Sequence, residues 1–396
     1  MDSATISDAY REIQIERFVV HELNEAEDTC LVFFGGIHGN EPSGISAMKK
    51  AFGLLREKKV ALRGNVYGVA GNLKALASGK RFLNRDLNRL WSEENIERLA
   101  SRDFIATYEE EEELQELWIL IQKLLQKHNG PFYFFDLHTT SSPTIPFLTV
   151  NDSLLNRQFT MQYPAPLILG IEEYLDGPLL SYLNELGYIS FGFESGQHES
   201  PEAETNHLAF IMLSLVFTGL LDRKEIDYEE YFASLGRKTN NFFEIYHRQK
   251  VAHTDEFSVN PGFKNFQKVN QGQLIATQNK MEIRADHSLQ IFMPLYQNQG
   301  NDGFFYIRPI SPTSLKLSKL LRRLRIDRLL SYLPGIKRDP DRKGMLHVNL
   351  GVAKFFRKEI LHLLGYREIS YKAETVIIRS REENSKVADY KNSSWN

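Results

Sequence analysis

The sequence predicts an α/β fold in which a mixed sheet is covered by helices, followed by a small C-terminal β-domain and a basic helical tail. Two observations predict this class. An apolar run at 31–34 ends in Gly35-Gly36 and is followed by helical apolar spacing over 42–55. Beyond about residue 240 the chain changes to short strand-like pieces separated by Gly, Asn and Pro. We therefore expect a main domain over 1–240, a β-domain over 241–310 and a basic extension over 311–396.

Within the main domain, strand-like runs alternate with helical patterns. Further strands are expected at 65–70, 132–135, 147–150, 167–171 and 188–193, and further helices at 108–127 and 201–221. The acidic run at 109–113 lies in the first turns of one helix, where acids favour the helix dipole, and we expect it to form a solvated face rather than a metal-binding tract. Cys30 is expected to be a buried strand residue.

Composition agrees with an ordinary enzyme-sized chain. Its 396 residues carry a formal charge of −3, which predicts no general affinity for nucleic acid, and its single cysteine fits a reducing compartment. The first 16 residues hold Asp2, Asp8, Arg11 and Glu12 without an apolar run, and no stretch of about 20 apolar residues follows. We expect a cytoplasmic protein without a secretory signal or membrane span.

The extension at 311–396 departs from this average, with 19 Lys plus Arg against 9 Asp plus Glu. Leucines alternate with basic residues over 315–330, which predicts a basic amphipathic helix. Such a helix could lie on an anionic membrane surface. The favoured interpretation is a helix that packs on its own protein and keeps a solvated basic face.

Three residues at the ends of predicted strands predict a metal site. His38 and Glu41 follow the first strand, and His138 follows the strand at 132–135. The carboxyl ends of strands in an open α/β sheet meet at the ligand crevice. Two imidazoles and one carboxylate leave a fourth position for water, which is typical of catalytic zinc. Asp136 is two residues from His138 and could orient a ligand, although a capping or backbone contact is equally open.

Four segments carry a more specific resemblance. These segments are, in order, GGIHGNE, RFLNRDLNR, DLHTT and FESG. Their combination resembles the succinylglutamate desuccinylase and aspartoacylase family, within the wider zinc carboxypeptidase group. The resemblance covers roughly residues 30 to 310. The resemblance implies a zinc carboxypeptidase-like fold with one Zn²⁺ per chain. It also implies that His38, Glu41 and His138 are the metal ligands.

The same resemblance assigns roles to other residues. Glu194 matches the catalytic glutamate that moves a proton from water to the leaving amine, and Arg81 matches the arginine beside the reacting carbonyl. Asn88 and Arg89 match the pair that binds a substrate carboxylate. Arg85 has no counterpart, and we expect it to lie at the surface or to pair with Asp86. His198 is a further, weaker candidate for the site.

Two departures limit what the resemblance implies. Aspartoacylases have another substrate arginine about ten residues before the catalytic glutamate, whereas Asn184 stands in that region and 176–193 contain no arginine. Acyl-aspartate is therefore not the expected substrate. A β-domain tyrosine of the family has no clear match, because Tyr296 and Tyr306 both lie in suitable segments.

The expected function is a zinc-dependent hydrolase that cleaves the amide bond of an N-acyl amino acid or a similar small amide. Its partner is a small-molecule substrate carrying an amide and a carboxylate, and a homodimer is compatible with the sequence. Two alternatives remain open. One is a zinc carboxypeptidase acting on peptides or cell-wall fragments, and the other is a non-catalytic zinc-binding protein with a membrane-directed tail.

Overall fold

The computed structural model describes residues 16–24, 26–101, 104–236, 241–353, 358–372 and 374–395. Asp2, Asp8, Arg11 and Glu12, on which the expectation about a secretory signal depends, lie outside the described residues. Within the described parts of the chain, none of the helices combines the length and apolar character needed to cross a bilayer.

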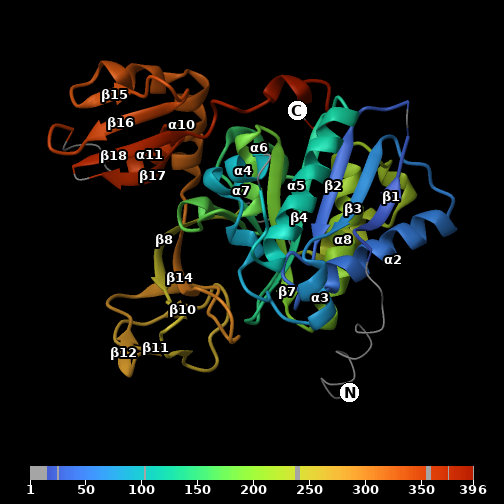
Figure 1. Cartoon of the computed structure of the whole chain (residues 1–396), viewed down its shortest axis with the longest axis horizontal. Helices are drawn as coiled ribbons and strands as arrows, with labels where there is room; N and C mark the ends of the chain where they lie inside the picture. Colours follow the sequence, from blue (N-terminus) through green and yellow to red (C-terminus); the bar gives the residue numbers. More distant parts are fainter. Residues whose placement is uncertain are drawn as a thin grey trace.

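The centre of the molecule is an eleven-stranded mixed sheet, which confirms the predicted fold class (Figure 1). Strands β3, β2, β4 and β7 are neighbours in that order and run parallel. Strand β1 pairs antiparallel at one edge, and β5 pairs antiparallel with β7. The strands of this part are β1 (Phe18–Glu22), β2 (Cys30–Gly35), β3 (Asn65–Ala70), β4 (Phe132–Thr140), β5 (Phe147–Val150), β6 (Leu167–Leu169) and β7 (Ile189–Gln197).

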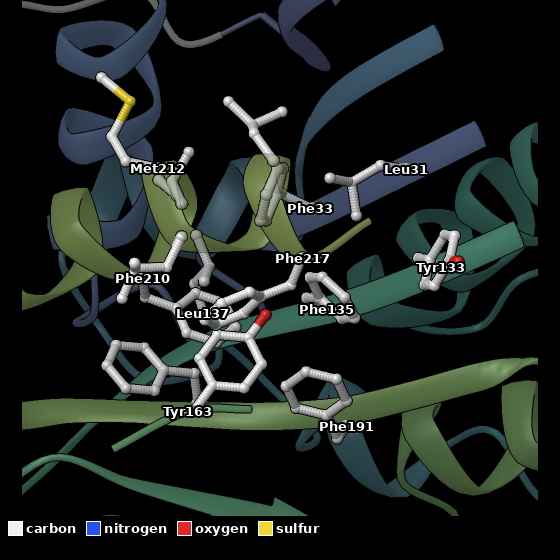
Figure 2. Packing of buried hydrophobic residues seen from close by; sticks show 14 of the residues in the cluster. Leu31, Phe33, Tyr133, Phe135, Leu137, Tyr163, Phe191, Phe210, Met212 and Phe217 are labelled. Carbon is white, nitrogen blue, oxygen red and sulfur yellow. The ribbon is translucent and has the colours of Figure 1, made fainter. Parts of the chain in front are cut away.

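Helices cover both faces of this sheet because its strands are apolar on both sides. Leu31 and Phe33 of β2 lie in the core under α2 (Ser43–Glu57) and α8 (Pro201–Phe217), where aromatic rings dominate the packing (Figure 2). Cys30 and Val32 point to the opposite face, under α5 (Glu109–Lys127). Cys30 is fully buried, as expected, and burial raises the pKa of its thiol. The other helices here are α3 (Leu73–Ser78), η1 (Leu87–Arg89), α4 (Glu93–Ala100), α6 (Leu154–Thr160), η2 (Ile171–Glu173), α7 (Leu179–Glu185), η3 (Arg223–Glu225) and α9 (Tyr228–Ser234).

The predicted β-domain is joined to the main sheet. Strand β8 (Phe242–Lys250) pairs with β6 on one side and with β14 (Asp302–Pro309) on the other, so the sheet continues through β13 (Leu289–Phe292) to β10 (Lys268–Val269). A second, three-stranded sheet is formed by β9 (Phe257–Val259), β11 (Leu274–Gln278) and β12 (Met281–Arg284). This shared pairing ties the position of the β-domain to the strands that carry the predicted metal ligands.

The extension after residue 311 begins with helix α10 (Pro312–Arg323), as predicted, but it is not a helical tail. It continues into a four-stranded antiparallel sheet with its own apolar core (Figure 1, orange to red). Alternating apolar residues in segments such as Met345–Asn349 and Thr375–Ser380 account for these strands. The remaining elements are η4 (Ile326–Tyr332), β15 (Ile336–Arg338), β16 (Met345–Asn349), α11 (Lys358–Leu363), β17 (Tyr366–Lys372), β18 (Thr375–Ser380) and η5 (Val387–Tyr390).

Helix α10 packs on its own protein and keeps Lys316, Lys319 and Arg323 exposed, as predicted, but Arg322 departs from this solvated face. Ser318 and Arg322 are buried, whereas Leu317 and Leu320 are 46% and 54% exposed. Arg322 was expected on the solvated basic face. Instead its guanidinium lies 2.8 Å from the buried carboxylate of Asp152 in the main domain, and this ion pair accounts for the burial of Arg322.

Candidate active site

The predicted metal ligands come from two neighbouring strand ends. His38 and Glu41 lie in the turn between β2 and α2, and His138 is near the end of β4. In the parallel pairing of β2 with β4, Gly35 is opposite Leu137, so the turn after Gly35 begins beside His138. The structure therefore brings together three buried residues, of which Glu41 and His138 are 97 positions apart in the sequence.

The two imidazoles face one carboxylate. His38 Nδ1 lies 2.8 Å from Glu41 Oε1, and His138 Nδ1 lies 3.1 Å from Glu41 Oε2. The candidate ligand atoms of all three residues lie within 4.8 Å of one another. The backbone N–H of Thr139 also donates to Glu41 Oε2 at 2.9 Å and holds the carboxylate in place.

The outer nitrogen of each imidazole faces a second carboxylate. His38 Nε2 lies 3.2 Å from Asp86 Oδ1, and His138 Nε2 lies 2.7 Å from Asp136 Oδ2. Metal-binding histidines commonly place a carboxylate on the nitrogen opposite the metal, which fixes the ring and its tautomer. Of the two open interpretations of Asp136, its position favours the orientation of a ligand. Asp86 has the same position on His38, a role that its place in the sequence motif does not indicate.

The electrostatics of the cluster fit a divalent cation. Burial alone would raise the pKa of Glu41, but His38 and His138 outweigh it and hold this pKa well below its ordinary value. Burial would lower the pKa of His138, whereas Asp136 and Glu41 raise it well above the ordinary value. The carboxylates thus stabilise positive charge on the imidazoles, and a bound metal would supply that charge while the imidazoles become neutral ligands. The His, Glu, His donor set suits Zn²⁺.

Glu194 lies one strand away from His138 and directly opposite it in the β4–β7 pairing. It is 7% exposed, and its Oε2 has no hydrogen-bond partner among the described residues. Burial, reinforced by the charges of Glu41 and Asp136, raises the pKa of Glu194 to about 8, although His138 and Arg81 act in the opposite direction. A carboxyl group with this pKa can accept and return a proton near neutral pH.

The arginine segment lies against the same cluster. Arg81 Nη1 is 3.4 Å from Glu41 Oε1, and its Nη2 is 3.1 Å from Asp86 Oδ2. Arg85 is exposed and lies over the ring of Tyr108 at 4.5 Å, so it is a surface residue and not the partner of Asp86.

Both residues predicted to bind a substrate carboxylate make side-chain hydrogen bonds to other residues of the protein. Asn88 is buried, and its side-chain oxygen accepts a hydrogen bond from Leu179 N at 2.9 Å. Arg89 donates from Nη1 to the carbonyl of Asn88 and from Nη2 to Asp302 Oδ2 at 2.9 Å.

The acidic run at the start of α5 anchors this arginine segment, and the expectation of a solvated face was wrong. Glu110 is fully buried and accepts hydrogen bonds from the backbone N–H groups of Leu83, Asn84 and Arg85. Glu113 is also buried, and it accepts a hydrogen bond from Lys74 N. The spacing could have shown this, because Glu110 and Glu113 continue the stripe of apolar residues Leu114, Leu117 and Ile121.

The segment 293–301 between β13 and β14 packs against the site. Gln297 Oε1 lies 3.0 Å from Asn40 Nδ2 and 3.1 Å from His198 Nε2. His198 Nδ1 is 2.7 Å from the hydroxyl oxygen of Thr139, next to the ligand His138. His198 therefore connects the β-domain to the end of β4 through its hydrogen bonds to Gln297 and Thr139.

Three residues stand where the sequence departs from the family pattern or matches it ambiguously, and each makes contacts that support the local fold. They are Asn184, Tyr296 and Tyr306. The amide of Asn184 donates to the carbonyls of Leu180 and Ser190, so it supports the junction of α7 and β7. The Tyr296 hydroxyl donates to Asn260 O and accepts from Phe263 N within the β-domain. The ring of Tyr306 stacks on His247. These contacts assign neither tyrosine to the metal cluster.

Comparisons with known proteins agree with this geometry. The family model described as the succinylglutamate desuccinylase/aspartoacylase catalytic domain matches residues 27–206. A succinylglutamate desuccinylase of Shewanella pealeana is 22% identical over 276 residues, which are 66% of this chain and 76% of that protein. One of Photorhabdus laumondii is 38% identical over 68 residues, and that alignment spans only 17% of this chain and 21% of the relative.

Among solved structures, a succinylglutamate desuccinylase of Vibrio parahaemolyticus aligns with a TM-score of 0.53 at 12% identity, over 73% of this chain and 83% of that chain. This likeness shows the fold. The family model matches the part of the chain, residues 27–206, that contains His38, Glu41, His138 and Glu194, and this part is therefore similar to the succinylglutamate desuccinylase and aspartoacylase catalytic domain.

Proposed function

We propose that the chain is a zinc-dependent amidohydrolase that cleaves an N-acyl amino acid or a similar small amide into a carboxylate and an amine. The names of its relatives describe removal of an acyl group, which supports a deacylase. The observation that carries the proposal is Glu194, a buried carboxyl group with a free oxygen, opposite the His138 end of the metal-ligand cluster. A site that only binds metal has no need of such a group.

The residues divide the chemistry between them. His38, Glu41 and His138 would hold the zinc, which when bound supplies a water of lowered pKa and polarises the amide carbonyl. Glu194 accepts the proton of the attacking water and returns it to the leaving nitrogen, so that the amine departs neutral. Arg81 contacts Glu41 and Asp86, and its guanidinium is available to stabilise negative charge on the carbonyl oxygen as it develops.

The test is hydrolysis by the zinc-loaded protein of a panel of N-acyl amino acids, small amides and short peptides. We expect Glu194→Gln to lower kcat by about 100-fold or more while one zinc per chain is retained, because only proton transfer is removed. The exposed Glu230→Gln is a matched control that should retain wild-type activity. Turnover of peptides alone would favour the carboxypeptidase alternative, and no turnover by the zinc-loaded chain would contradict the proposal.

A further inference from the structure

The exposed side of α10 carries cations and leucines in two adjacent stripes. At about 100° per residue, the two stripes occupy neighbouring parts of the helix surface, opposite the buried side chains of Ser318 and Arg322. The basic stripe is Lys316, Lys319 and Arg323, and the leucine stripe is Leu317, Leu320 and Leu324. The three leucines are 46%, 54% and 62% exposed, respectively. The helix therefore presents an apolar row to solvent, although its other side is packed on the protein.

The basic stripe is not matched by acidic residues of the chain. In the part of the chain that the structure describes, its three side chains form no ion pair, whereas the buried Arg322 contacts both Asp152 and Glu382. The stripe also belongs to an extension with a surplus of Lys and Arg over Asp and Glu. Its charges are therefore available to an anionic partner.

An apolar groove adjoins the basic stripe. Its volume is about 1330 Å³, and the three cations line it together with side chains of α6, β8 and the start of α10. The apolar part of the lining includes Leu155, Met161, Phe242, Ile310, Leu315 and Val387. Among the described residues that line it, the one acid is Glu382, which already faces Arg322 at 3.1 Å. On α10, the cations thus lie between an apolar groove and an exposed row of leucines.

This combination fits the surface of an anionic membrane. The cations attract the charged headgroups of anionic lipids, and leucines insert at the boundary between headgroups and acyl chains. The groove offers an apolar surface to an acyl chain whose headgroup lies at the cations. A nucleic acid would use the cations but leave the leucines and the groove in water. A second copy of the chain on a twofold axis would bring two basic stripes together as like charges.

We propose that the exposed side of α10 and the adjoining groove bind anionic phospholipid, by which the chain docks on a membrane surface. The docked helix lies along the surface, with one side packed on the protein and the other in contact with lipid. This inference goes beyond the proposed amide hydrolysis and does not depend on it.

The test is flotation of the full-length, zinc-loaded protein with two kinds of vesicle. One kind contains phosphatidylcholine alone, and the other is an equimolar mixture of phosphatidylcholine and phosphatidylserine. We expect the protein to bind the mixed vesicles at least about tenfold more strongly, and this binding to weaken as salt is added.

A triple variant tests the cations. Replacement of Lys316, Lys319 and Arg323 by Gln should weaken binding to the mixed vesicles by about 100-fold, because three surface charges are lost. The matched control makes the same change of charge on the same extension, away from the groove, and should bind like wild type. It replaces the exposed Lys337, Arg338 and Lys391 by Gln.

Two further variants test the apolar surfaces. Met161 lines the groove and is 42% exposed, and Met161→Glu should weaken binding by about tenfold because a carboxylate repels the lipid headgroup. The control Met281→Glu adds the same charge at a residue of β12 that is 71% exposed, and it should bind like wild type. Leu317→Ser combined with Leu320→Ser should weaken binding by about tenfold without any change of charge.

Several outcomes would overturn the lipid site. Equal binding of wild type to both kinds of vesicle would do so, as would equal binding of the two triple variants. A dimer in analytical ultracentrifugation that the leucine variant abolishes, or binding of duplex DNA, would assign the surface to that partner if vesicles do not bind. If the triple variant does not fold, the lipid preference and salt dependence of wild type decide. Inactivity toward every amide would refute the proposed hydrolysis and leave the vesicle result unchanged.

Discussion

Asp86 connects the two halves of the candidate site at the level of single residues. Its Oδ1 lies 3.2 Å from His38 Nε2 and accepts from Asn88 N at 2.9 Å, while its Oδ2 lies 3.1 Å from Arg81 Nη2. Both oxygens are therefore in use. The contact with Nε2 turns the other nitrogen of His38 toward Glu41, where a metal would bind.

We predict that Asp86→Asn lowers the affinity for Zn²⁺ by about 10-fold to 100-fold, because an amide holds the imidazole less firmly and makes it a weaker ligand. Asp136→Asn should act similarly through His138. Competition with a chromophoric chelator measures both constants, with the exposed Arg85→Gln as the control. Unchanged affinity in both aspartate variants would show that these carboxylates do not support metal ligands.

The turn between β2 and α2 determines where His38 and Glu41 lie, and Gly39 determines where the turn lies. A Cβ atom on Gly39 would be 2.1 Å from the carbonyl carbon of Ala75 and 2.4 Å from the carbonyl oxygen of Lys80. Gly39 N also donates to Arg81 O at 3.1 Å. The turn therefore packs directly on the backbone that leads into the arginine segment, and only glycine permits this approach.

Gly39→Ala should therefore destabilise the protein by about 1–3 kcal/mol and weaken zinc binding, since the methyl group would force the turn away from α3. Gly53→Ala is the matched control. Its Cβ meets nothing within 4 Å, and α2 should gain about 0.5–1 kcal/mol from the better helix former. Urea denaturation of the metal-free variants gives both values. A Gly39→Ala variant as stable as wild type would show that the turn tolerates the displacement.

Elements of the site could be predicted where the residues that indicate them lie close together in the sequence. The turn and β4 each carry a strand pattern and a chemically distinct residue within a few positions, so His38, Glu41 and His138 could be proposed from the pattern, whereas the role of Glu194 came from the family resemblance. The contact of Arg89 with Asp302 spans 213 positions and leaves no local pattern. The burial of Glu110 differs in kind, because acidic residues in the first turn of a helix usually form a solvated face, whereas the position of Glu110 in the apolar stripe indicates burial.

At the scale of the whole molecule, the chain after the four-stranded sheet returns to the main domain. Tyr390 is fully buried in the main core, where its hydroxyl donates to Phe132 O and accepts from Ile189 N at 3.0 Å. Trp395 Nε1 donates to the Tyr133 hydroxyl at 3.1 Å. Figure 1 shows this last segment beside the main sheet. The basic extension, which composition alone marks as a separate tail, thus contributes side chains to the core that supports β4 and β7.

This anchoring predicts that the extension stabilises the main domain. Tyr390→Ala should lower the free energy of unfolding by about 3–5 kcal/mol, because it removes a fully buried aromatic ring. Tyr390→Phe should lower it by about 1–3 kcal/mol, because Phe132 O and Ile189 N lose the hydroxyl group. Tyr332, 82% exposed on the same extension, gives the control Tyr332→Ala with an expected change below about 0.5 kcal/mol. Urea unfolding followed by circular dichroism measures all three, and a Tyr390→Ala variant equal to the control would mean that the extension is not docked in solution.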